Sequence, residues 1–164
     1  MKRLSLFVII CLVCLPLKGI AQEYGSSSVK RVAVMDIIDE DGEFTKGMKR
    51  MVRGFLTDAI TRTQGYEGYT REDISSIMKE HSFQRDGLVD PAQIKEMGKM
   101  TGADYIVILE LVKLDEYNIS YIAQILDVVT GRIANSGTLN AKNDVADYQS
   151  SCISVARKLL YNLK

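Results

Sequence analysis

The sequence is poor in the residues that most often build reactive sites. It has one histidine and three cysteines among 164 residues. The histidine, His81, has no second histidine or cysteine with which to share a zinc ion, and no serine and aspartate set out with it as a triad. We therefore expect His81 to interact with the last carbonyl groups of a short helix that ends beside it.

Cysteine is too scarce for an internal disulfide bond. Cys11 and Cys14 lie in an apolar run at the amino terminus, and Cys152 is the only cysteine after it. Because one cysteine cannot close a disulfide, the fold must be stabilised by its core. Cys152 lies on the apolar stripe of an amphipathic helix, which predicts a small buried residue rather than a reactive thiol.

The motifs of common enzymes and metal sites are absent. No phosphate loop, metal-ligand spacing or nucleophile motif occurs, and the glycines in turns are explained by helix ends and hairpins. Asp39, Glu40, Asp41 and Glu43 form an acidic cluster before a helix, where the helix dipole favours carboxylates, and the cluster lacks the calcium-loop pattern. We expect a solvated loop there, no cofactor, no bound metal and no catalytic residue, so that the protein is not an enzyme.

The first 21 residues are typical of a cleaved export signal. Two basic residues precede the apolar run 4–17, and Gly19-Ile20-Ala21 is a small-residue cleavage site. The run is shorter than the roughly twenty apolar residues that span a membrane. We predict cleavage between Ala21 and Gln22, and a periplasmic or secreted protein for which outer-membrane association stays open.

Lipidation and charge further constrain the mature chain. Neither Cys11 nor Cys14 follows the small residues of a lipoprotein signal, although the sequence does not decide whether either is lipidated. Loss of Lys2, Arg3 and Lys18 leaves 18 basic and 21 acidic residues, a net charge of about −3. This balance argues against nucleic acid as a partner. No integral membrane insertion is expected, and homo-oligomerisation stays open.

The remaining chain is expected to be one globular domain, 30–164, after a flexible lead-in, 22–29. Hydrophobic periodicity predicts an α/β fold, a mixed β-sheet with packed helices in two or three layers, in the order βαβααβββα. The predicted strands are 32–38, 66–70, 105–114, 119–128 and 132–139, and the predicted helices are 44–63, a short one starting after Thr70, 91–101, and one starting near 143–144.

The stretch 87–107 is the centre of this pattern. Asp90 before Pro91, with Gln93 three residues after Asp90, is a helix-start signal, and Gly102 is a helix stop. Apolar Ile94, Met97 and Met100 recur near helical spacing between them. A continuous apolar strand follows directly, which indicates that a helix is joined to a buried strand.

The residues of this stretch, GLVD and then GADYIV, resemble the periplasmic domain shared by the CsgG-like curli secretion-channel family, the LpoB-type activators of penicillin-binding proteins and the amino-terminal domain of TolB. VAVMD at 32–36, LTDAI at 56–60 and LDVVTGRI at 126–133 resemble its opening strand, first helix and hairpin. The resemblance covers nearly all of the mature chain and implies an anticodon-binding-domain-like fold with strand 66–70 at or near an edge. It also implies a non-catalytic envelope protein that binds a protein partner.

Two roles follow from this resemblance. The first is an activator or assembly factor of a cell-envelope or secretion machine, and the alternative is a subunit of a curli-type outer-membrane channel. The channel family inserts membrane hairpins whose strands need roughly nine to eleven residues each, whereas the connections 115–118 and 129–132 are tight turns. The sequence leaves open the partner and whether the protein serves secretion or peptidoglycan synthesis.

Two stretches are candidate partner surfaces. The first is a basic row on the predicted helix 44–63, which could contact an acidic partner, nucleic acid or phospholipid, although such a row is more often a solvated face. The second is a polar turn. The candidate residues are Lys46, Lys49, Arg50, Arg53, Asp115, Glu116, Tyr117 and Asn118.

Overall fold

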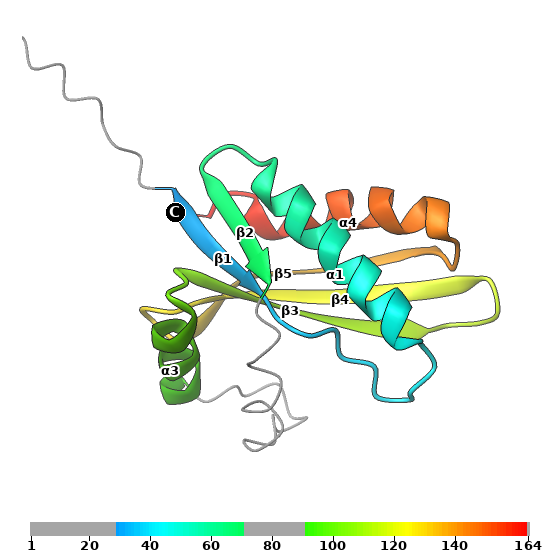
Figure 1. Ribbon diagram of the computed structural model, residues 1–164, viewed down its shortest axis with the longest axis horizontal. Helices are drawn as coiled ribbons and strands as arrows, with labels where there is room; N and C mark the ends of the chain where they lie inside the picture. The colour runs from blue at the N-terminus through cyan, green and yellow to red at the C-terminus, as the bar shows by residue number, and fades with distance from the viewer. Residues whose placement is uncertain (1–28, 71–90, 164) are drawn as a thin grey trace, which may run out of the picture.

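A five-stranded mixed sheet forms the centre of the protein, in the order β2-β1-β3-β4-β5 (Figure 1). The computed structural model describes residues 29–70 and 91–163. β1 pairs in parallel with β2 and β3, and β3, β4 and β5 form an antiparallel meander. The strands are β1 (Lys30–Val34), β2 (Tyr66–Thr70), β3 (Tyr105–Lys113), β4 (Asn118–Asp127) and β5 (Arg132–Lys142).

Helices cover both faces of the sheet. α1 (Lys46–Thr61) and α4 (Val145–Leu160) lie side by side on one face, and α3 (Pro91–Thr101) packs on the other (Figure 1). β3 is apolar on both faces: Val107 and Leu109 belong to the core under α1 and α4, and Ile106 and Ile108 to the smaller core under α3. This alternation explains the continuous apolar run in the sequence. The predicted α/β class and mixed sheet are confirmed.

The observed element limits follow from local hydrogen bonds. α1 starts at Lys46 rather than at Phe44 because Thr45 caps it, accepting the amide hydrogen of Met48 at 3.2 Å. Asp144 caps α4 in the same way through Ala146. β5 runs three residues beyond the predicted end because its pairing with β4 continues to Lys142. The predicted Asp90 cap, the short helix after Thr70, His81 and the signal segment lie outside the described residues.

Two apolar residues that fit the helical spacing of a buried face are exposed. Met100 lies outside the face of α3 that buries Ile94 and Met97, because at 3.6 residues per turn it is rotated away from both. The buried face continues instead through Thr101, whose hydroxyl donates to the Met97 carbonyl at 2.8 Å. Val145 is the first residue of α4 and lies at the end of the helix beside the β3–β4 turn, where the sheet no longer covers it.

Glycines let two segments approach the rest of the fold closely. Gly131 has φ of +70°, and a Cβ on it would lie 2.7 Å from the Cα and carbonyl oxygen of Pro91. A Cβ on Gly98 of α3 would lie 2.8 Å from the Cβ of Val128. The turn after β4 therefore docks against the start of α3 only because these positions lack side chains.

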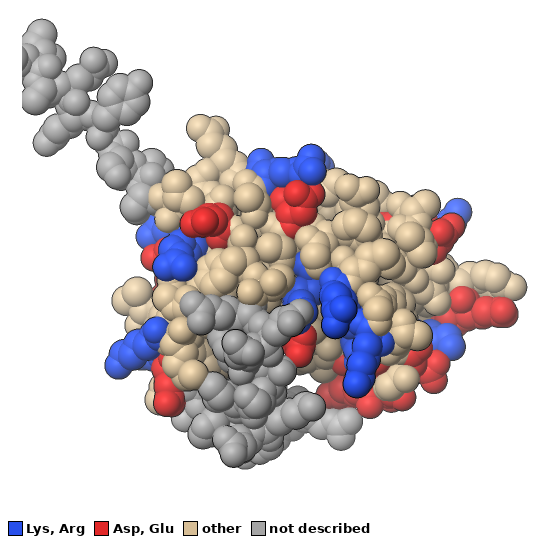
Figure 2. Space-filling view, in the orientation of Figure 1, with Lys and Arg blue, Asp and Glu red and all other residues tan. Residues whose placement is uncertain are grey.

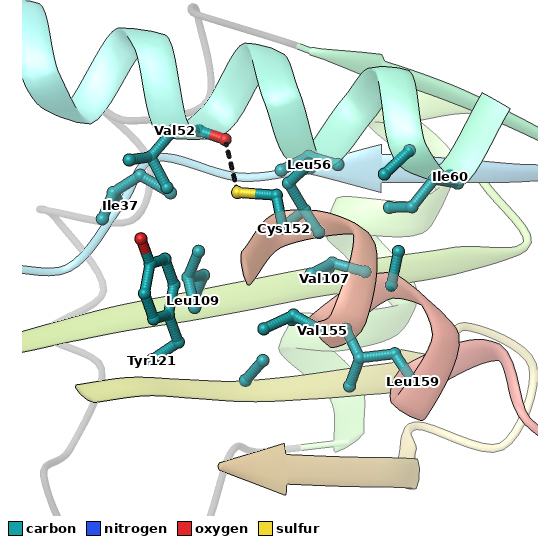
Figure 3. Packing of buried hydrophobic residues seen from close by; sticks show 14 of the residues in the cluster. Ile37, Val52, Leu56, Ile60, Val107, Leu109, Tyr121, Cys152, Val155 and Leu159 are labelled. Atoms are coloured by element: carbon teal, nitrogen blue, oxygen red, sulfur yellow. Dashed lines mark hydrogen bonds between the residues drawn. The ribbon is translucent and has the colours of Figure 1, made fainter. Parts of the chain in front are cut away.

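Cys152 is buried at the contact of α4 with α1, as predicted (Figure 3). Its Sγ lies 3.5 Å from the Val52 carbonyl oxygen, and burial raises the pKa of the thiol to about 12. Cys152→Ala should lower the free energy of unfolding by about 1 kcal/mol in chemical denaturation, because it removes a small buried group. Native Cys152 should also resist thiol reagents that rapidly label a Ser150→Cys variant, and equal labelling of the two would contradict its burial.

Candidate partner-binding surfaces

The acidic loop before α1 is closed by one of its own carboxylates. Asp39 accepts the amide hydrogens of Glu43 at 3.0 Å and Phe44 at 3.1 Å, and pairs with Lys49 at 3.2 Å. Burial alone would raise the pKa of Asp39, but the hydrogen bonds from Phe44, Lys49 and Glu43 outweigh it and hold the pKa below its usual value. Asp39 and Lys49 thus stabilise the loop. Within the described residues, no group of three or more His, Cys, Asp or Glu residues could hold a metal ion.

The predicted basic row is divided by the fold. Arg53 is only 6% exposed and forms an ion pair with Asp36, just after β1, so its prediction as part of the outer row is wrong. It is buried because it lies three residues before Leu56 and seven before Ile60, on the buried face of α1. Lys46 and Arg50 are exposed, and Lys49 is half-buried against Asp39. The outer face of α1 therefore offers a weaker positive surface than the sequence indicated.

The β3–β4 turn is stiffened by two of the predicted candidates. Asp115 accepts the amide hydrogens of Tyr117 and Asn118, both at 2.8 Å, and the side-chain amide of Asn118 at 2.8 and 2.9 Å. The hydrogen bonds from Asn118, with that from Tyr117, lower the pKa of Asp115. Asp115 and Asn118 therefore hold the turn in shape, which leaves Glu116 and Tyr117 as the side chains that it presents.

Three large apolar side chains are exposed at this end of the molecule. Tyr117 is 71%, Val145 59% and Leu114 51% exposed. Asn143 donates its amide hydrogen to the Tyr117 carbonyl at 2.7 Å, which holds the segment before α4 beside the turn, and Leu114 donates to the Asn118 carbonyl at 3.0 Å, which closes the turn. We call Leu114, Glu116, Tyr117 and Val145 the tip surface.

Acidic side chains lie near the tip surface on the face that Figure 2 shows. Figure 2 shows them gathered at the end of the molecule that holds the β3–β4 turn and the loop before α1. Sequence reasoning missed Leu114, which falls in the predicted strand 105–114, and Val145, whose spacing fits the apolar stripe of α4. The only available signal was the position of Leu114 directly before a polar turn.

Comparison with known proteins identifies the family. Residues 18–121 match the family model described as curli production assembly/transport component CsgG. This match spans more than half of the chain, so the chain belongs to the CsgG family, and the resemblance is confirmed. No curated protein sequence matches it. No helix of the described residues is long and apolar enough to cross a membrane.

Solved structures share the fold at low sequence identity. The PelC dodecamer from Paraburkholderia phytofirmans is 13% identical, with a TM-score of 0.52 over 80% of this chain and 85% of that chain. TolB from Acinetobacter baumannii is 10% identical, with a TM-score of 0.51 over 79% of this chain and 27% of that one. The LpoB C-terminal domain from Salmonella enterica is 15% identical, with a TM-score of 0.49 over 74% and 89%.

Proposed function

We propose that the mature chain is an exported, non-catalytic protein of the cell envelope that binds another protein, as an activator or assembly factor of an envelope or secretion machine. Membership of a family described by curli assembly and transport supports this role. The export signal predicted in the sequence supports the location. The tip surface is the observation that carries the proposal.

Grouped exposure distinguishes the tip surface from ordinary surface residues. Single exposed apolar side chains are common, whereas several at one end of a molecule, with polar residues around them, favour a site of protein contact. Aromatic residues on rigid supports are also favoured as binding anchors, and Asp115 makes this turn rigid. We propose that Tyr117 is the anchor and that the nearby acids favour a partner with a basic rim.

The proposal predicts a difference between two equally exposed tyrosines. Tyr117 at the tip is 71% exposed and Tyr161, after the last turn of α4, is 70% exposed. Tyr117→Ser should reduce partner recovery from the crosslinked envelope at least about tenfold, because hot-spot truncation costs 2 kcal/mol or more. Tyr161→Ser is the matched control and should recover the partner as the unmodified chain does. Equal recovery by both variants would place the contact away from the tip surface.

The alternative is a subunit of a secretion channel, which the family description also favours. The connections within the meander are short, 114–117 and 128–131, and Asp115 and Asp127 close them through backbone hydrogen bonds. On the proposed function, purified mature protein leaves dye-loaded liposomes intact. Dye release by detergent-resistant rings of this chain would favour the channel.

A further inference from the structure

β5 is an edge strand whose outward-facing backbone groups can be assigned. Asn143 donates to Tyr117 and Leu114 to Asn118, so odd-numbered residues of β5 past the bulge direct their backbone groups toward β4. Leu139, for example, pairs with Tyr121. The groups of even-numbered residues therefore point to the open edge. These residues are Ser136, Thr138, Asn140 and Lys142.

Only the first half of this edge is protected. Asn135 accepts the amide hydrogen of Ser136 with its own side chain at 2.9 Å, and Lys158 of α4 donates to the Thr138 carbonyl at 2.7 Å. The first contact occupies the Ser136 amide and blocks strand addition there. The second is made by the flexible side chain of Lys158, which must release the Thr138 carbonyl before another strand can pair with it. Among the described residues, no hydrogen bond reaches the amide of Thr138 or the outward backbone groups of Asn140 and Lys142.

We propose that the open half of β5 pairs antiparallel with β5 of a second copy, with Asn140 on the two-fold axis. Asn140 then exchanges both backbone hydrogen bonds with its own counterpart, and Thr138 pairs with Lys142 of the second copy. Three outward residues at even spacing are self-complementary in this arrangement, which is the requirement for a two-fold interface. The paired segment 138–142, TLNAK, has no proline, and the charge on Lys142 is its one feature that opposes strand addition.

α4 carries a second element of complementarity. Asp147, Ser154 and Lys158 share one stripe that is not buried in the chain, and Lys158 reaches the β5 edge from it. Asp147 and Lys158 are eleven residues apart, which is about 16 Å along the helix. A β-strand covers the same distance in about five residues. Since Lys158 lies over Gly137 and Thr138, Asp147 lies near Lys142.

The two-fold axis through Asn140 exchanges the position of Asp147 with that of Lys158. Asp147 of one copy therefore faces Lys158 of the other, on both sides of the axis. Ser154, which is half-buried between them, leaves room for the neighbouring helix because its side chain is small. The backbone pairing and the charge pairing specify the same register, which favours a second copy over an unrelated peptide as the occupant.

The proposal is independent of the tip surface. Because only a short strand segment and one helix face are buried, the area falls below the roughly 1,000 Å² of a stable interface, and we expect a weak, reversible dimer. Sedimentation equilibrium of the mature protein up to about 1 mM, the range of weak association, should show a monomer–dimer equilibrium. A monomer at every concentration would overturn the proposal.

Proline variants test the strand pairing. Asn140→Pro removes an amide that points away from β4, so the monomer keeps its sheet, as circular dichroism should show. Two hydrogen bonds are lost per dimer, and dimerisation should weaken about tenfold or more. Ser136→Pro, on the same edge but outside the proposed pairing, is the control and should dimerise as the unmodified chain does. Equal dimerisation by Asn140→Pro would overturn the proposal.

Charge reversal and crosslinking test the register. Asp147→Lys should abolish dimerisation, and Asp147→Lys combined with Lys158→Asp should restore it. An Asn140→Cys chain should form a symmetric disulfide on oxidation, because residues in such a pair have Cα atoms about 5.5 Å apart. Ser136→Cys should not. A dimer that forms without the Asn140→Cys crosslink, or a charge exchange that restores nothing, would contradict this interface.

Discussion

Gly131→Ala is expected to lower the free energy of unfolding by about 3 kcal/mol, the sum of a left-handed backbone cost and a steric overlap. The residue has φ of +70°, where an L side chain is strained. Its Cβ would also lie 2.7 Å from Pro91 backbone atoms, which a rotamer change cannot move. Because this contact joins the β4–β5 turn to α3, chemical denaturation should show the loss directly.

Gly42 provides a matched control for this substitution. It has the same φ of +70°, but a Cβ there has nothing within 4 Å. Gly42→Ala should therefore cost only the backbone part, about 1–2 kcal/mol. If the two variants were equally unstable, the close approach of the turn to Pro91 would contribute nothing to stability.

Leu56→Ala should also lower the free energy of unfolding by about 3 kcal/mol, because truncating a buried leucine loses its transfer energy and leaves a cavity. Leu56 is fully buried on the face of α1 that packs on the sheet and α4 (Figure 3). Urea denaturation with a single transition midpoint gives the value. Lys46→Ala, on the exposed start of the same helix, should change stability by less than about 0.5 kcal/mol. A Leu56→Ala loss no larger than this would show that the core relaxes to fill the cavity.

Local sequence signals predicted most of the helices and strands, because each signal strongly restricts the backbone at the residue that carries it. The β2 limits match the prediction, Pro91 begins α3, and Gly102 follows its end with φ of +65°. Each depends on a residue whose backbone preference is unusual. The end of β5 was missed because it depends on pairing with Asn118 of β4, which no local signal reports.

The candidate surfaces were harder to predict because exposure depends on distant partners. Arg53 fits the basic row of α1 by sequence, yet it lies on the buried face of the helix, where Asp36, seventeen residues away, pairs with it. Val145 fits the apolar stripe of α4 by spacing, and only the end of the sheet beneath it leaves it exposed. Periodicity identifies a face of a helix but not where along the helix its cover stops.

The position of β1 between β2 and β3 has a consequence for how the chain folds. The meander of β3, β4 and β5 with α4 is built from neighbours in sequence, whereas β1 joins β3 across more than seventy residues, as Val32 with Tyr105. Closing that loop costs entropy before any contact repays it, so we expect the carboxyl-terminal half to become ordered first and β1 to insert late. During synthesis the first strand therefore emerges long before β3, with Val32, Ala33 and Val34, all buried in the native state, exposed to other chains.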